Sequence, residues 1–214
     1  MTPDDLRLAA EVCRQTLEPA LDADWGVVAG ELTWDCRRTL DHIVDALLFY
    51  SVDLAVAGED RPFPRSGDGT ASVSRLLTTV DSASAVLAAV ARGVPAGTRG
   101  YHPAGMADAE GFLAMGCDET LIHTDDIASG LGVAFAPPAD LCARVLARLF
   151  PWAPRAGAAA PAPATDPWAV LRWANGRTAL PGRARLDGSW YWHCAPLDEW
   201  DGTVARRTRP PGWT

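Results

Sequence analysis

The chain has 214 residues and a mass of 22.8 kDa, with 48% hydrophobic residues and a mean hydropathy of −0.01. This composition is globular rather than disordered, and the length fits one domain with a full core or one domain with a small appendage. The net charge of −8 argues against nucleic acid as a partner, because such binding needs a cationic surface. All 19 basic side chains are arginine, which excludes lysine Schiff-base chemistry and a lysine-containing phosphate loop.

No targeting or membrane-spanning segment is predicted. The first residues, MTPDDLRLAAE, are acidic and lack the apolar core of a signal peptide. Apolar runs such as IVDALLFY are shorter than the roughly 20 residues that a bilayer needs. We therefore expect a cytoplasmic protein that binds no membrane, with its five scattered cysteines reduced. The frequency of twofold assemblies favours a homodimer.

Hydrophobic spacing and helix-boundary residues predict four long helices in the first part of the chain. Their predicted extents are residues 2–21, 33–58, 72–92 and 108–128. Thr33 is the expected N-cap of the second helix and Asp108 that of the fourth. A shorter helix is expected after Pro137 and Pro138, and GVPAGTRGYHPAG is expected to be irregular. With almost no alternating pattern, the sequence predicts an all-α fold, a four-helix bundle over residues 1–152.

The remaining residues are predicted to form a linker and a tail. The Ala- and Pro-rich residues 153–165 have the composition of a linker. In the tail, residues 166–214, DPWAVLRWANG predicts a short helix, and Asp187-Gly188 predicts a type I′ hairpin. Six of the nine tryptophans lie after residue 165, and burying this apolar surface is expected to draw the tail onto the bundle.

The fourth helix carries an unusual set of polar residues in the segment GCDETLIHTDDIASG. At about 100° per residue, Glu119, His123 and Asp126 share one helix face. The other residues of that face are apolar or glycine: Phe112, Met115, Gly116, Ile127 and Gly130. Asp118 and Asp125 are assigned to the solvent side. A buried carboxylate needs a cation or strong donors, and Glu and His four residues apart supply two ligands to one metal.

A third ligand is expected from a facing helix. His42 lies in the middle of the second helix, away from its main Leu/Ile stripe, whereas His102 lies in a loop and His193 in the tail. Two histidines and one carboxylate with open coordination positions suit zinc, and also nickel or non-haem Fe(II). The alternative remains open at this point, since Glu–His pairs are common on exposed helices and His42 fits an ordinary core histidine.

The segments LTWDCRRTLDHIVDALLFY and HPAGMADAEGFLAMGCDETLIHTDDIASGLG resemble the DinB-like metalloprotein superfamily. The closer resemblance is to its actinobacterial branch, the mycothiol-dependent maleylpyruvate isomerase N-terminal domain proteins and the mycothiol S-transferases. It covers roughly residues 1–150, and PWAVLRWANGRTALPGRARL resembles the tail of many such chains. The resemblance implies a four-helix bundle in which His42, Glu119 and His123 bind a divalent metal, usually zinc.

The resemblance also implies an activity. We expect a metal-dependent transferase or isomerase that activates a low-molecular-weight thiol such as mycothiol for reaction with a small electrophile. Asp126 is expected to orient an imidazole or to act as a base. Trp34, Arg37 and Arg38 are candidates for contacts with the thiol cosubstrate, with solvated arginines as the alternative. A non-catalytic metal-binding protein, and an iron-dependent or hydrolytic enzyme that uses the same three ligands, are the alternative functions.

Overall fold

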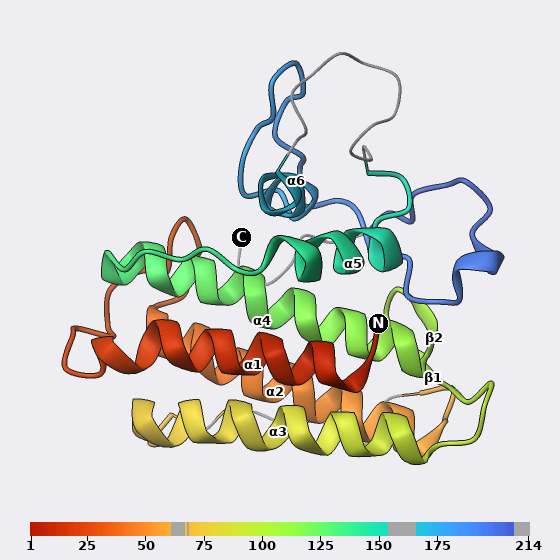
Figure 1. The fold of residues 1–214 in the computed structure, drawn as a ribbon, viewed down its shortest axis with the longest axis horizontal. Helices are drawn as coiled ribbons and strands as arrows, with labels where there is room; N and C mark the ends of the chain where they lie inside the picture. The colour runs from red at the N-terminus through yellow and green to blue at the C-terminus, as the bar shows by residue number, and fades with distance from the viewer. Residues whose placement is uncertain (61–66, 68, 154–165, 208–214) are drawn as a thin grey trace.

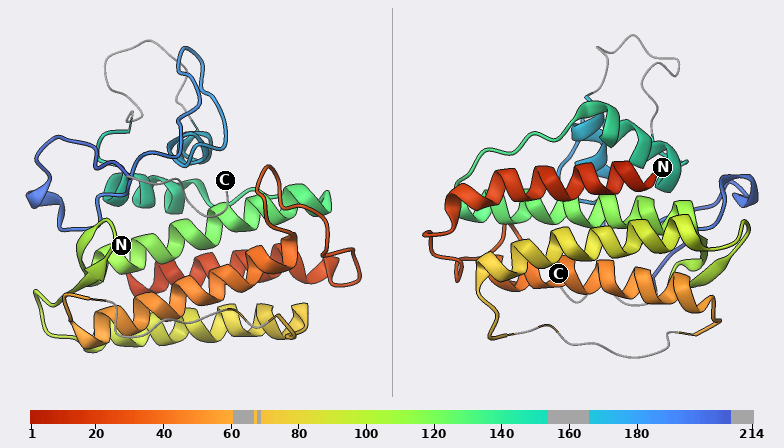
Figure 2. Two further views of the ribbon diagram at one scale, coloured as in Figure 1. Left: turned by 180° about the vertical axis from the view of Figure 1, so that it is seen from behind. Right: turned by 60° about the horizontal axis from the view of Figure 1, so that its bottom comes forward.

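The computed structural model describes residues 1–60, 67, 69–153 and 166–207. The described chain is mostly helical, with one small antiparallel sheet (Figure 1). Four long helices lie alongside one another, with α5 packed on α4 and α6 packed on α5 (Figures 1 and 2). The helices are α1 (Pro3–Leu17), α2 (Cys36–Val56), α3 (Val73–Gly93), α4 (Ala109–Leu131), α5 (Ala139–Leu149) and α6 (Pro167–Ala174). Two short 3-10 helices, η1 (Glu18–Ala20) and η2 (Leu197–Glu199), complete the helical elements of this part of the chain.

Capping side chains fix where the long helices begin. Asp108 caps α4 as predicted, because its side chain accepts the N–H of Gly111. The prediction for α2 was wrong by two residues, since its N-cap is Asp35 rather than Thr33. Backbone hydrogen bonds hold the preceding loop in a non-helical path, from Ala29 N to Trp34 O and from Cys36 N to Val27 O. A local capping residue therefore predicts a boundary only where the preceding loop makes no competing backbone hydrogen bonds.

A hairpin occupies the segment predicted to be irregular. Strands β1 (Arg99–His102) and β2 (Gly105–Asp108) pair antiparallel, with Arg99 opposite Asp108 and His102 opposite Gly105. The strands are too short for an alternating pattern to show in the sequence. A Cβ atom at Gly100 would lie 2.4 Å from the carbonyl oxygen of Asp53, so only glycine allows β1 to approach α2 this closely.

The tail contains the predicted short helix, α6, but not the predicted hairpin. Neither Asp187 nor Gly188 has the positive φ that a type I′ turn requires. The Asp187 carboxylate instead accepts hydrogen bonds from the N–H and the hydroxyl of Ser189, which closes a local turn. The bridges in this region pair Leu180 with Arg183 and Trp190 with Arg206. Residues 154–165 of the predicted linker lie outside the described residues.

The tail covers the side of α4 that the other long helices leave open. Trp190, Trp192 and Cys194 are buried in one continuous core with the bundle. The buried Arg148 of α5 donates hydrogen bonds to the carbonyl oxygens of His193 and Cys194, both at 3.1 Å. Every residue of α4 from 111 to 124 is consequently buried, so this helix has no solvent-exposed face in its middle, and its polar side chains there must find partners inside the protein.

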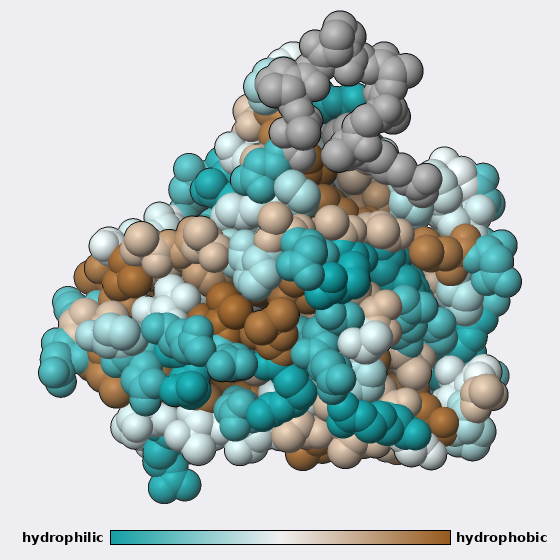
Figure 3. Space-filling model, in the orientation of Figure 1, coloured by the Kyte–Doolittle hydropathy of each residue, from teal (hydrophilic) through white to brown (hydrophobic). Residues whose placement is uncertain are grey.

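One helix among the described residues, α3, is long and apolar enough to cross a membrane by length and composition alone. The sequence prediction had found no such run. Core helices of proteins outside membranes meet the same criteria, and 39% of the apolar window of α3 is buried. The space-filling view shows hydrophilic beside hydrophobic side chains over this helix, along the lower edge of the molecule (Figure 3).

Candidate metal centre

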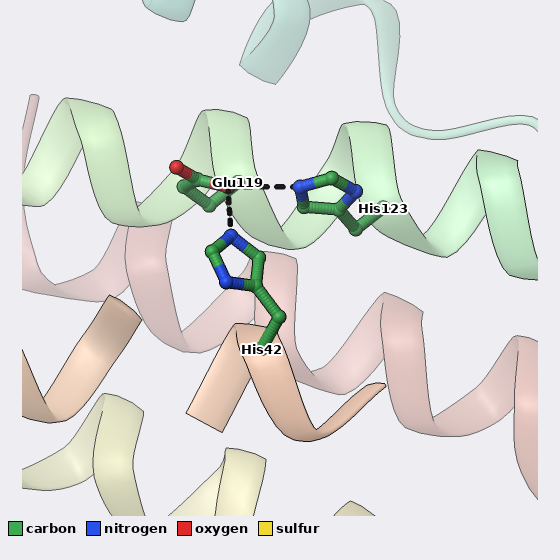
Figure 4. A group of neighbouring side chains, drawn as sticks. All are labelled: His42, Glu119 and His123. Carbon is green, nitrogen blue, oxygen red and sulfur yellow. Dashed lines mark ion pairs between the residues drawn. The ribbon is translucent and has the colours of Figure 1, made fainter. Parts of the chain in front are cut away.

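Two imidazoles and one carboxylate from two helices meet inside the protein. Nε2 of His123 lies 3.1 Å from Oε2 of Glu119, and Nε2 of His42 lies 3.4 Å from the same oxygen. The figure shows His42 reaching across from α2 toward the two ligand candidates on α4 (Figure 4). The rings of His42 and His123 are nearly perpendicular, with centroids 5.0 Å apart. The structure thus brings together the three residues that the sequence singled out.

The spacing of these atoms fits a metal ion. One donor atom from each of the three residues lies within 4.8 Å of the other two. Donor atoms around four-coordinate zinc, at bond lengths of about 2.0–2.1 Å, are separated by about 3.3 Å. The two nitrogen-to-oxygen distances bracket that value. The second oxygen of Glu119, Oε1, accepts a hydrogen bond from the hydroxyl of Tyr50 at 3.2 Å, which holds the carboxylate with Oε2 toward the histidines. This group can hold a metal ion.

Asp126 lies behind His123 rather than on its metal-facing side. Its Oδ2 is 3.0 Å from Nδ1 of His123. Both carboxylate oxygens of Asp126 also accept hydrogen bonds from Arg177 of the tail, each at 2.8 Å. A carboxylate in a two-pronged arginine pair is an acceptor, so Nδ1 of His123 is the donor. Of the two roles expected for Asp126, the geometry favours orienting the imidazole over acting as a base.

The side chains of this group shift one another's pKa values through hydrogen bonds and charge. Burial alone raises the pKa of Glu119, but hydrogen bonds from His123 and His42 outweigh it and hold this pKa well below its usual range. Burial lowers the pKa of His123, yet its contacts with Asp126 and Glu119 raise that pKa to about 9 in the metal-free protein. The pKa of Asp126 is lowered, because the hydrogen bonds from His123 and Arg177 overcome the effect of burial. A metal ion must therefore displace a proton from His123.

Asp118 is buried, which contradicts its assignment to the solvent side. It is 1% exposed, and its carboxylate accepts hydrogen bonds from Nδ2 of Asn175 and Nε1 of Trp192, both at 2.9 Å. Burial raises the pKa of Asp118 to about 7 despite these two donors. Asp125, the other acid assigned to solvent, is partly buried and pairs with Arg172 at 3.0 Å. The periodicity of α4 did not reveal these contacts, because all three partners, Asn175, Trp192 and Arg172, belong to the tail.

A cavity lies on each side of the three-residue group. The first has a volume of about 300 Å³ between α4 and the tail, and its walls include Glu119, His123, Trp190, Trp192 and Arg207. The second has a volume of about 450 Å³ at the start of α2, and its described walls include Trp34, Arg37, Arg38, Asp41 and His42. The residues proposed from the sequence for cosubstrate contacts thus line the cavity on the His42 side.

The other histidines and the cysteines stand apart from this centre. His102 is buried between the rings of Tyr50 and Trp192, and its Nδ1 accepts the N–H of Ala104. Nε2 of His193 is 2.8 Å from the carbonyl oxygen of Pro196. Burial raises the pKa of every cysteine thiol: to about 11 for Cys13, Cys36 and Cys194, to about 12 for Cys142, and upward for Cys117. Such thiols are poor nucleophiles at neutral pH.

Comparisons of the chain with known protein families, with curated proteins and with solved structures gave no match. The interpretation of this centre therefore depends on its own geometry and chemistry.

Proposed function

We propose that this chain is a DinB-like four-helix bundle enzyme that uses a divalent metal, zinc by preference, to activate a low-molecular-weight thiol of the mycothiol type. The reaction is S-transfer to, or isomerisation of, a small electrophilic substrate. The single observation that carries the proposal is the position of both Nε2 atoms, of His42 and His123, against one oxygen of Glu119. Three protein ligands with open positions are typical of catalytic rather than structural metal sites.

The charges of the donor set favour a cosubstrate thiol, rather than a protein side chain, as the nucleophile. His42 and His123 are neutral ligands and Glu119 carries one negative charge, so the loaded centre keeps a net positive charge. When bound, zinc supplies a Lewis acid that favours the thiolate form of a thiol near neutral pH. The protein has no cysteine suited to act as the nucleophile itself, since burial raises the pKa of all five thiols. A cosubstrate thiol fills that role.

The two cavities support a reaction between two small molecules. Glu119 and His123 line the cavity of about 300 Å³, and His42 lines the one of about 450 Å³, so each cavity borders part of the centre. In S-transfer the thiol gives its proton to solvent, its sulfur bonds to an electrophilic carbon, and a leaving group departs with the electron pair of the broken bond. In isomerisation the sulfur adds to one carbon of a double bond, the resulting single bond rotates, and elimination of the thiol restores the double bond. Trp190 and Trp192 give the first cavity an apolar wall against which a small electrophile can pack, beside charged side chains such as Arg207.

The test is thiol consumption by the metal-loaded protein. The purified chain is stripped with a chelator, reloaded with zinc, nickel or Fe(II), and mixed with mycothiol and a panel of small electrophiles. We expect zinc to restore the rate, and His123→Ala to lower it by about 100-fold or more, because loss of a ligand exceeds the 10–100-fold cost of losing an outer partner.

His193→Ala is the control, since His193 lies outside the centre and bonds within the tail. Equal, uncatalysed rates for the wild type and His123→Ala across the panel would contradict the proposal. Oxygen consumption by the iron-loaded protein without loss of thiol would favour an oxygenase that uses the same ligands. Glutathione and free cysteine, tested beside mycothiol, identify the thiol.

A further inference from the structure

The tail reaches the metal centre through a chain of three polar side chains. Arg177, 51 residues after Asp126 in the sequence, donates two hydrogen bonds of 2.8 Å to the carboxylate of Asp126. Asp126 in turn accepts a hydrogen bond from Nδ1 of His123 at 3.0 Å. All three side chains are at least 85% buried, with exposures of 15%, 5% and 2%. Ion pairs this far from solvent are held in one geometry and are weakly screened by salt.

We propose that Arg177 is a positioning residue for the metal ligand His123, so that docking of the tail sets the affinity of the centre for its metal. This inference rests on the proposed function only in assuming that the three-residue group binds a divalent ion.

The physical argument concerns which ring nitrogen carries hydrogen. Arg177 holds Asp126 as an ionised carboxylate that cannot donate, and Nδ1 of His123 must then be the protonated nitrogen. When a metal ion replaces the proton between Nε2 and Oε2 of Glu119, which lie 3.1 Å apart, Nδ1 keeps its hydrogen and the ring keeps its orientation. Without Arg177, the Asp126 carboxylate loses its two-pronged clamp and turns away from Nδ1, and the ring of His123 is no longer held in that orientation. Outer partners of this kind contribute 10–100-fold to metal affinity.

A neighbouring ion pair provides a matched comparison. Arg172 of α6 pairs with Asp125 of α4 at 3.0 Å, so it also ties the tail to the same turn of the same helix. Asp125, however, has no contact with a ligand of the centre among the described residues. Arg172 is 40% exposed and Arg177 15%. A purely structural role of the tail arginines predicts that zinc affinity falls only as far as stability does in either variant, whereas a positioning role predicts a loss of affinity for Arg177→Ala beyond its loss of stability.

The experiment measures zinc affinity by competition with a chromophoric chelator for the wild type, Arg177→Ala, Arg177→Lys and Arg172→Ala. We expect Arg177→Ala to weaken zinc binding by about 10–100-fold, Arg177→Lys to fall between it and the wild type, and Arg172→Ala to remain within about twofold. In the Asp126→Ala background, Arg177→Ala should have no further effect, because both substitutions break the same chain.

The Nδ1 hydrogen of His123, observed by NMR in the zinc-loaded protein, gives a second measurement. It should exchange slowly with solvent in the wild type and in Arg172→Ala, and faster in Arg177→Ala, because Asp126 then no longer holds it. Equal zinc affinities of Arg177→Ala and Arg172→Ala would overturn the positioning role while leaving the proposed function intact. A wild-type protein that binds no zinc would remove both.

Discussion

The bundle and the tail are stabilised by different interactions. The described residues of the bundle, 1–60, 67 and 69–149, surround an interior of fully buried aliphatic side chains, such as Leu6, Leu47 and Leu121. The described tail, residues 166–207, contributes buried tryptophans, but it also binds α4 through polar groups that meet carboxylates. Asn175 and Trp192 bind Asp118, Arg172 pairs with Asp125, and Arg177 binds Asp126.

The carboxylates that the tail binds lie beside Glu119 and His123, which connects the tail to the candidate metal centre. Asp118 directly precedes the candidate ligand Glu119, and Asp126 follows the candidate ligand His123 by one turn. The apolar interior fixes the helices and hence where the candidate ligands lie. The polar contacts of the tail hold the groups beside these residues, and tail side chains line one of the cavities next to them. Three substitutions separate these two contributions, in order of decreasing expected effect.

Removing a core side chain of the bundle is expected to destabilise the whole protein. Leu47 is 0% exposed, and Leu47→Ala should lower the free energy of unfolding by about 3 kcal/mol, through lost burial and the cavity left behind. Urea denaturation followed by circular dichroism measures the change. The control is the same substitution at the next residue, Leu48→Ala, because Leu48 is only partly buried. An equal cost at both positions would show that the interior does not dominate the stability of the bundle.

Blocking the contact between tail and bundle is expected to have a smaller and more local effect. A Cβ atom at Gly111 of α4 would lie 2.1 Å from the carbonyl oxygen of Cys194, so Gly111→Ala must displace the tail backbone there. Overpacking of this kind costs about 2 kcal/mol. Tryptophan emission should shift to longer wavelength while the helical signal is retained.

Gly93→Ala is the control for Gly111→Ala. Gly93 is also helical, but a Cβ atom there would have no neighbour within 4 Å. Both variants gain helix propensity, so their difference reports the close contacts at Gly111, the shortest of which is with the tail backbone and the others with side-chain atoms of Arg148 and Asp108. If Gly111→Ala unfolded the helices as well, tail and bundle would form one cooperative unit and the distinction between them would fail.

The sequence predicts the part of this centre that depends on local geometry. The four-residue spacing of Glu119 and His123 and the apolar residues of their face indicate a buried pair, because a helix converts spacing directly into direction. The approach of His42 could only be inferred by elimination among four histidines, with support from the family resemblance. A packing contact between α2 and α4 decides it, and no local pattern encodes that contact.

The contacts of the tail could not be predicted. Asp118 reads as a solvent-side residue because helical periodicity has no information on a segment that returns from 57 residues further along the chain. The same holds for Arg177, which looks like any surface arginine until its path to Asp126 is known. The hairpin of β1 and β2 was missed because two four-residue strands are too short for alternation to be recognised.

The smallest predicted effect tests the polar junction itself, through pH. The pKa of Asp118 is raised to about 7 in the folded protein, above the unfolded value of 3.8. The folded state therefore binds this proton more tightly than the unfolded state. The resulting stabilisation is fully present below about pH 4, and it is lost as the pH rises through 7.

Between pH 6 and pH 8 this loss amounts to about 1 kcal/mol of unfolding free energy. The measurement compares urea unfolding of the metal-free wild type and Asp118→Asn at both pH values. Asparagine does not titrate, so the stability of the variant should fall less, and the difference between the two slopes removes the contribution of other groups, including His123. If the unfolding free energies of the two proteins fell equally between pH 6 and pH 8, Asp118 would have an ordinary pKa and would stay ionised beside Glu119. Its hydrogen bonds with Asn175 and Trp192 would then provide all of its stabilisation. In that case the tail would hold an ionised carboxylate, rather than a neutral acid, next to Glu119. The metal-free centre would then have one more negative charge beside it.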